Sequence, residues 1–138
     1  MTDKIKIMIV ETNAEYRDFT RRQLEYEENI EILGFADNGE AAIEQARKLR
    51  PHVILMMTMN MPKMNGLQAT EIIKREMSAA QIIFFLLANE IHEMRQGLQM
   101  GVFECVGKPI PSAELADVIE RAFQEFCRAA GGNATDYA

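Results

Sequence analysis

The residues that could do chemistry in this chain follow predicted strands. Glu11 and Thr12 come directly after the apolar run 5–10, and Thr58 follows the apolar run that begins at Val53. Lys108 comes shortly after the run 102–106. In an open parallel sheet, ligands and reacting groups collect at the carboxyl ends of the strands. A carboxylate, hydroxyls and an amine would therefore share that edge.

These groups do not form any of the common catalytic sets. The chain has no Gly-rich phosphate loop, and no Ser/His/Asp or Cys/His set lies at the predicted strand ends. Mg²⁺ usually takes one or two carboxylates besides other oxygens, and residues 52–70 contain no acid. The sequence therefore predicts a protein that is not an enzyme and that holds no metal or cofactor. The alternative that these absences disfavour is a small α/β enzyme or nucleotide binder.

Apolar runs that alternate with amphipathic stretches predict the elements that carry these residues. The predicted strands are 5–10, 30–36, 52–57, 81–87 and 102–106. The predicted helices are 14–27, a second ending at about Leu49, 66–77, 90–100 and 113–128, with Asn89 and Ser112 capping the last two. The runs 52–57 and 81–87 are apolar on both faces, as in central parallel strands. This order predicts an α/β fold, a doubly wound five-stranded parallel sheet with helices on both faces.

The composition of the chain limits its expected partners and its expected cellular location. The 138 residues carry a formal net charge of -6 and no basic run, so nucleic-acid or anionic-membrane binding is not expected. No apolar run approaches the roughly 20 residues of a membrane span, and no secretion signal is visible. Cys105 and Cys127 form no metal or redox motif. We expect a cytoplasmic protein, with one domain over 1–129 and a flexible tail over 130–138.

Three short segments carry a family resemblance. They are the Met61-Pro62 turn with Asn65-Gly66 after it, Asp37-Asn38-Gly39, and Gly107-Lys108-Pro109. With the order of the elements, they make residues 4–127 resemble a CheY-like response-regulator receiver domain. The resemblance implies the flavodoxin-like (βα)5 fold, the strand order 2-1-3-4-5, and a place in two-component phosphorelay signal transduction.

The resemblance also implies a phosphoryl site, from which this chain departs. In the family, two acids after the first strand and an aspartate after the third bind Mg²⁺, and that aspartate accepts the phosphoryl group. A Thr or Ser ends the fourth strand, and an aromatic residue and a Lys-Pro pair belong to the fifth. Here the acidic pair falls on Glu11 and Thr12, and the acceptor on Met57, counted from Pro51, or on Thr58, counted from Pro62. The remaining positions fall on Leu86 or Leu87, on Cys105, and on Lys108 and Pro109.

The sequence thus predicts a pseudo-receiver, a phosphorylation-independent protein-interaction module without the phospho-accepting aspartate. By the resemblance, its partner protein binds helix four, strand five and helix five, at about residues 89–128; a homodimer is left open. The alternative is a phosphorylatable receiver with Thr58 or Glu11 as an atypical acceptor. Two interpretations of Glu11 also stay open: an ion pair with Lys108, or a partly solvated acid near a helix N-terminus.

Overall fold

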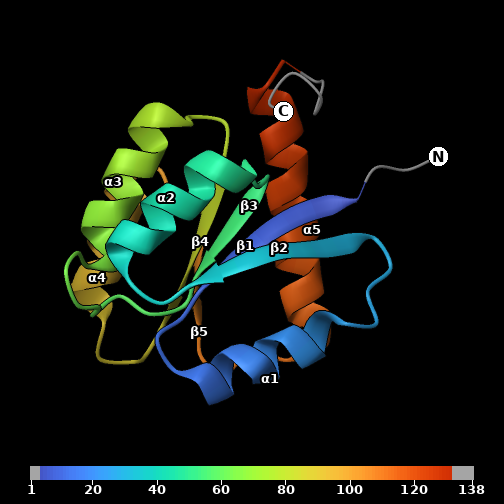
Figure 1. Cartoon of the computed structure of the whole chain (residues 1–138), viewed down its shortest axis with the longest axis horizontal. Helices are drawn as coiled ribbons and strands as arrows, with labels where there is room; N and C mark the ends of the chain where they lie inside the picture. Colours follow the sequence, from blue (N-terminus) through green and yellow to red (C-terminus); the bar gives the residue numbers. More distant parts are fainter. Residues whose placement is uncertain (1–3, 132–138) are drawn as a thin grey trace.

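A computed structural model describes residues 4–131 and shows one sheet with helices on both sides (Figure 1). The five strands pair in parallel in the order β2-β1-β3-β4-β5, which confirms the predicted fold class and strand order. The strands are β1 (Ile5–Val10), β2 (Ile30–Ala36), β3 (Val53–Met56), β4 (Gln81–Leu86) and β5 (Glu104–Gly107). The helices are α1 (Ala14–Leu24), α2 (Gly39–Leu49), α3 (Gly66–Glu76), α4 (Ile91–Met100) and α5 (Ser112–Ala129).

The sheet is buried on both faces. Helices α2, α3 and α4 cover one face, and α1 and α5 cover the other (Figure 1). In β3, Ile54 and Met56 point toward the first group of helices, whereas Val53 and Leu55 point toward the second. All four side chains are fully buried, which explains the continuous apolar run in the sequence.

Most of the predicted tail, 130–138, lies outside the described residues, so the boundary at 129 stays a prediction. Within residues 4–131, none of the helices combines the length and the apolar character that crossing a membrane requires.

Asparagine side chains cap the N-termini of α1, α2 and α3. The Asn13 side chain accepts the Tyr16 N–H, and the Asn38 side chain accepts the Ala41 N–H. Asn65 and Gln68 cap α3 reciprocally. These bonds satisfy backbone donors that have no partner within the helix.

Two of the predicted caps are wrong. The residue before α4 is Glu90 rather than Asn89, and it makes no side-chain cap bond, because its carboxylate accepts the Leu87 N–H at 2.7 Å instead. Ser112 is already the first residue of α5 and follows Pro111, so its hydroxyl does not cap the helix. Strand β5 also begins two residues later than predicted, at Glu104.

The loop between β3 and α3 is packed rather than loose. Met59 and Met61 are 3% and 7% exposed and belong to the core beneath α2 and α3. The Gly66 N–H donates to the Met59 carbonyl at 2.8 Å, which closes the loop. These methionines anchor the chain just after Thr58 and thereby fix the position of that residue.

Thr70, on α3, offers a test of core packing. Its side chain is fully buried, and its hydroxyl has no hydrogen-bond partner among the described residues. Because a buried hydroxyl without a partner is unfavourable, Thr70→Val should raise the free energy of unfolding by about 1 kcal/mol. Thr20→Val is the matched control: this buried hydroxyl donates to the Tyr16 carbonyl at 3.1 Å, so its loss should lower stability. Urea titrations of both variants measure the change in the free energy of unfolding. A change of the same sign in the two variants would contradict this interpretation.

Candidate functional site

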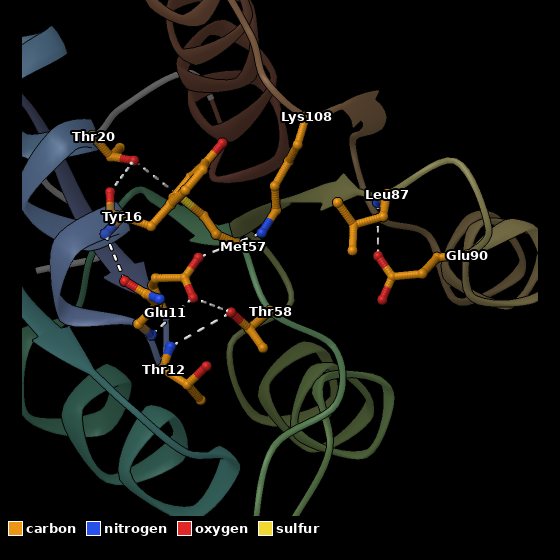
Figure 2. Close-up of polar contacts among 10 residues, drawn as sticks. Glu11, Thr12, Tyr16, Thr20, Met57, Thr58, Leu87, Glu90 and Lys108 are labelled. Carbon is orange, nitrogen blue, oxygen red and sulfur yellow. Dashed lines mark hydrogen bonds and ion pairs between the residues drawn. The ribbon is translucent and has the colours of Figure 1, made fainter.

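The carboxyl ends of four strands meet at one edge of the sheet. In the strand register Val10 pairs with Met56, Met56 with Phe84, and Leu86 with Gly107. The residues that follow these strands are therefore neighbours, as Figure 2 shows for Glu11, Thr58, Leu87 and Lys108. Most of the polar residues singled out in the sequence come together here.

Glu11 lies at the centre of this edge and is 3% exposed. Its Oε2 atom accepts the Thr58 hydroxyl at 2.5 Å and the Asn13 N–H at 3.0 Å. Its Oε1 atom lies 3.4 Å from the Lys108 Nζ atom (Figure 2). The ion-pair interpretation of Glu11 is confirmed, and the partly solvated alternative is wrong.

Met57 and Thr58 point in different directions. The Met57 N–H donates to the Val10 carbonyl at 2.9 Å, so Met57 continues the ladder between β1 and β3. Its side chain is 1% exposed and lies among the core residues beneath α1 and α5. The Thr58 hydroxyl faces Glu11 and also lies 3.4 Å from the Thr12 N–H. Thr12 thus contributes its backbone, whereas its side chain is exposed.

The Lys108 ammonium has two close neighbours. Its Nζ atom lies 4.7 Å from the centre of the Tyr16 ring, in addition to its contact with Glu11. Only 13% of its side chain is exposed, and the following peptide bond, to Pro109, is cis. Burial raises the pKa of the Tyr16 hydroxyl, and the charge of Glu11 raises it further. The Lys108 ammonium therefore has both a carboxylate and an aromatic ring as neighbours.

The ends of β4 and β5 contribute no hydroxyl to the site. Leu86 is buried, whereas Leu87 is 53% exposed. Cys105 is half-buried, and its Sγ atom lies 3.9 Å from the Met94 carbonyl. Burial raises the pKa of the Cys105 thiol, and the charge of Glu104 adds to the effect. The thiol is therefore protonated near neutral pH.

These residues do not fit the magnesium ion that the family resemblance implies. Glu11 supplies a carboxylate, but both of its oxygens already have partners, and one of those partners is a cation. Within residues 4–131, no group of three His, Cys, Asp or Glu side chains could hold a metal ion. Mg²⁺ prefers an octahedral set of oxygens with one or two free carboxylates, and this site does not provide it.

Sequence reasoning missed the part that α1 plays in the site. Tyr16 lies over Lys108, although 92 positions separate the two along the chain (108 − 16). The cap at Asn13 starts α1 at Ala14 and so places Tyr16 in its first turn, facing the end of β5. The cap was a usable signal for the helix, but it did not indicate which ring would meet the lysine.

Comparisons with known proteins identify the family to which the chain belongs. The family model described as "Response regulator receiver domain" matches residues 7–120. A protein-glutamate methylesterase/protein-glutamine glutaminase of Methanococcoides burtonii is 34% identical over 115 residues, which cover 83% of this chain and 32% of that protein. The response regulator protein VraR of Staphylococcus epidermidis is 28% identical over 120 residues, covering 87% of this chain and 57% of VraR. The chain thus spans about a third of the length of the methylesterases it matches.

Solved structures that resemble this chain are also receiver domains. The signal receiver domain of a modulated diguanylate cyclase from Desulfovibrio desulfuricans superposes with a TM-score of 0.83 at 25% identity, over 92% of this chain and 99% of that one. The response regulator domain of Thermotoga maritima CheB gives 0.76 at 25% identity, over 88% and 97%. Together with the family model and the strand order, these matches show that the chain belongs to the response-regulator receiver domains of two-component signalling.

Proposed function

We propose that this receiver domain acts as a phosphorylation-independent protein-interaction module. The observation that carries the proposal is the state of Glu11. Its charge is already satisfied by Lys108 and Thr58, and residues 52–70 contain no acid. The domain then keeps the architecture of its family without the group that would accept a phosphoryl.

The electrostatics of the site support this proposal. A phosphoryl dianion beside Glu11 would meet a like charge and would compete with it for Lys108. Removing such an ion from water without matching partners costs several kcal/mol. Leu87, at the end of β4, cannot donate a hydrogen bond to a phosphoryl oxygen from its side chain.

We assign the family's site positions as follows. We take Met57, whose backbone continues the ladder with β1, as the residue at the acceptor position, and Thr58 as the residue whose side chain faces Glu11. Met57 is the residue reached by counting from Pro51, and Thr58 is the residue reached by counting from Pro62. The other assigned positions are Glu11, Thr12, Leu86 or Leu87, Cys105, Lys108 and Pro109.

We further propose that a partner protein binds the face formed by α4, β5 and α5. Ile91 and Leu98 on α4 are 54% and 53% exposed, which leaves apolar area available for a contact. Phe103, before β5, is partly exposed beneath Arg121.

We also propose that the domain is located in the cytoplasm and has no enzymatic activity of its own. Sedimentation measurements over a range of concentrations would show whether the domain also forms a homodimer.

Exposure to a small phosphoryl donor tests the main proposal. The domain is incubated with Mg²⁺ and acetyl phosphate beside a phosphorylatable receiver domain, and intact masses are recorded before and after acid treatment. We expect no added phosphoryl mass on this chain, because Glu11 is engaged by Lys108 and Thr58 and residues 52–70 offer no carboxylate to accept the group. A phosphoryl group that maps to Thr58 or Glu11 would instead establish the atypical-acceptor alternative.

A further inference from the structure

Two hollows adjoin each other at the start of α4. The first, which we call the apolar groove, has a volume of about 260 Å³ and lies between α4 and β5; Leu87, Ile91, Met94, Cys105 and Gly107 are among its lining residues. The second, the polar pocket, has a volume of about 360 Å³ and is lined by Asn60, Asn65, Asn89, Glu90 and Glu93, with Met59 and Leu67. Glu90 lines both hollows, so a single ligand could occupy the two together.

The apolar groove exists because β5 presents small residues to α4. Cys105 and Gly107 lie two positions apart in the strand and therefore point to the same face of the sheet. A Cβ atom added at Gly107 would meet no described atom within 4 Å, so the space above this residue is open. Leu87 and Ile91, at the rim, are both more than half exposed. The groove is therefore an accessible apolar site.

The polar pocket carries negative charge. Glu90 and Glu93 both line it, and only one oxygen of Glu90 is engaged, by the Leu87 N–H. Amide side chains make up the rest of the polar lining, and no Lys or Arg is among the described residues that form it. Lys108, which lines the apolar groove, forms an ion pair with Glu11. The charged groups that line the polar pocket are therefore two carboxylates, which attract a cation that enters it.

From this juxtaposition we infer that the start of α4 binds a basic amphipathic protein segment. An aliphatic or aromatic side chain of the segment fills the apolar groove, and a neighbouring Lys or Arg enters the polar pocket beside Glu90 and Glu93. The inference rests on the proposed interaction function and adds to it the chemistry of the partner. Apolar anchors give such contacts most of their affinity, while the charges give them selectivity and association rate.

The charge of the surface excludes two other occupants. A nucleic acid would bring phosphates against Glu90 and Glu93, which repel them. A second copy of this chain, paired about a two-fold axis at this spot, would place the same two acids against their own copies. The chain as a whole carries a formal net charge of -6, so its long-range field also attracts a basic partner.

Binding of a defined peptide tests the inference. The probe is a helical peptide of leucines and lysines with the leucines on one face, and the comparison peptide has glutamate in place of every lysine. Fluorescence anisotropy should show binding of the lysine peptide at least about tenfold tighter than that of the glutamate peptide. Its binding should displace the amide resonances of Ile91, Met94 and Val106.

Substitutions in each of the two hollows test whether the peptide binds there. Gly107→Leu fills the apolar groove, where the added side chain has room, and should weaken binding about tenfold. Ile91→Gln removes part of the apolar wall at an exposed position and should act in the same direction if the glycine variant does not fold. Glu93→Lys should also weaken binding, whereas Glu28→Lys, an equal change of charge at an exposed residue in the loop before β2, should leave it nearly unchanged.

Equal binding of the two peptides, or equal weakening by Glu93→Lys and Glu28→Lys, would overturn the inference. Either result would mean that the peptide senses net charge alone or does not use these hollows. Neither result bears on the phosphoryl-donor experiment, which tests the proposed function separately. A domain that accepts a phosphoryl group and still binds the lysine peptide would reject the first proposal and keep this one.

Discussion

Replacing Lys108 by methionine should lower the free energy of unfolding by about 3 kcal/mol, because Glu11 would be left as a buried charge without its cation. The carboxylate is 3% exposed and would retain only the Thr58 hydroxyl and the Asn13 N–H as partners. Methionine keeps the apolar stem of lysine, so the loss reports charge rather than packing. Urea or thermal unfolding measures it directly.

A control and a double variant make this result specific. Lys48→Met removes an exposed lysine at the end of α2 and should change stability by no more than about 0.5 kcal/mol. Adding Glu11→Gln to Lys108→Met removes the uncompensated charge, so the double variant should recover a part of the loss, with a coupling energy of about 1–2 kcal/mol. Additive effects of the two substitutions would show that the ion pair contributes nothing to the fold.

Substitution of Gly39 by alanine should be about as damaging, at about 3 kcal/mol, although alanine favours helices over glycine by roughly 1 kcal/mol. A Cβ atom at Gly39, the first residue of α2, would lie 2.0 Å from the Met64 carbonyl oxygen and 2.7 Å from the Met64 Cβ atom. Backbone cannot yield as a flexible side chain does, so α2 and the β3–α3 loop would have to separate. That loop also anchors Thr58 against Glu11.

The matched control for Gly39→Ala is Gly107→Ala. The added methyl group at Gly107 meets no described atom within 4 Å, so stability should change little. Amide spectra of Gly39→Ala at a temperature where it is still folded should show shifts at Glu11 and Thr58, because the loop that carries Thr58 has moved. Stability equal to that of the unchanged protein would contradict the close packing of α2 on this loop.

The fold was predictable because its signals are local and repeated. Apolar runs gave the strands, and the helices expected to begin at residues 14 and 66 do begin at Ala14 and Gly66. The start of α4 was misplaced for a physical reason. Asn89 has the side chain of a good cap, but Glu90 turns back to the Leu87 N–H and sets the geometry of that turn. Sequence patterns cannot show which of two adjacent polar residues reaches a backbone donor.

The site was predictable only in part. Residues after parallel strands must share an edge, so the meeting of Glu11, Thr58 and Lys108 followed from topology. The choice between Met57 and Thr58 did not follow, because consecutive side chains at a strand end point in different directions and the two sequence anchors differ by one residue. The contact of Tyr16 with Lys108 depends on how α1 docks on the sheet, and no pattern in the sequence encodes it.

Titration with Mg²⁺ tests whether Glu11 is available to a metal. Lys108 and Thr58 already engage both oxygens of its carboxylate. The measurement follows the amide resonances of Glu11, Thr58 and Lys108 while Mg²⁺ is added to millimolar concentrations at constant ionic strength. We expect no saturable change at these three residues. A saturable shift confined to them would show a working metal site and would mean that the ion pair with Lys108 does not keep Glu11 from binding a metal.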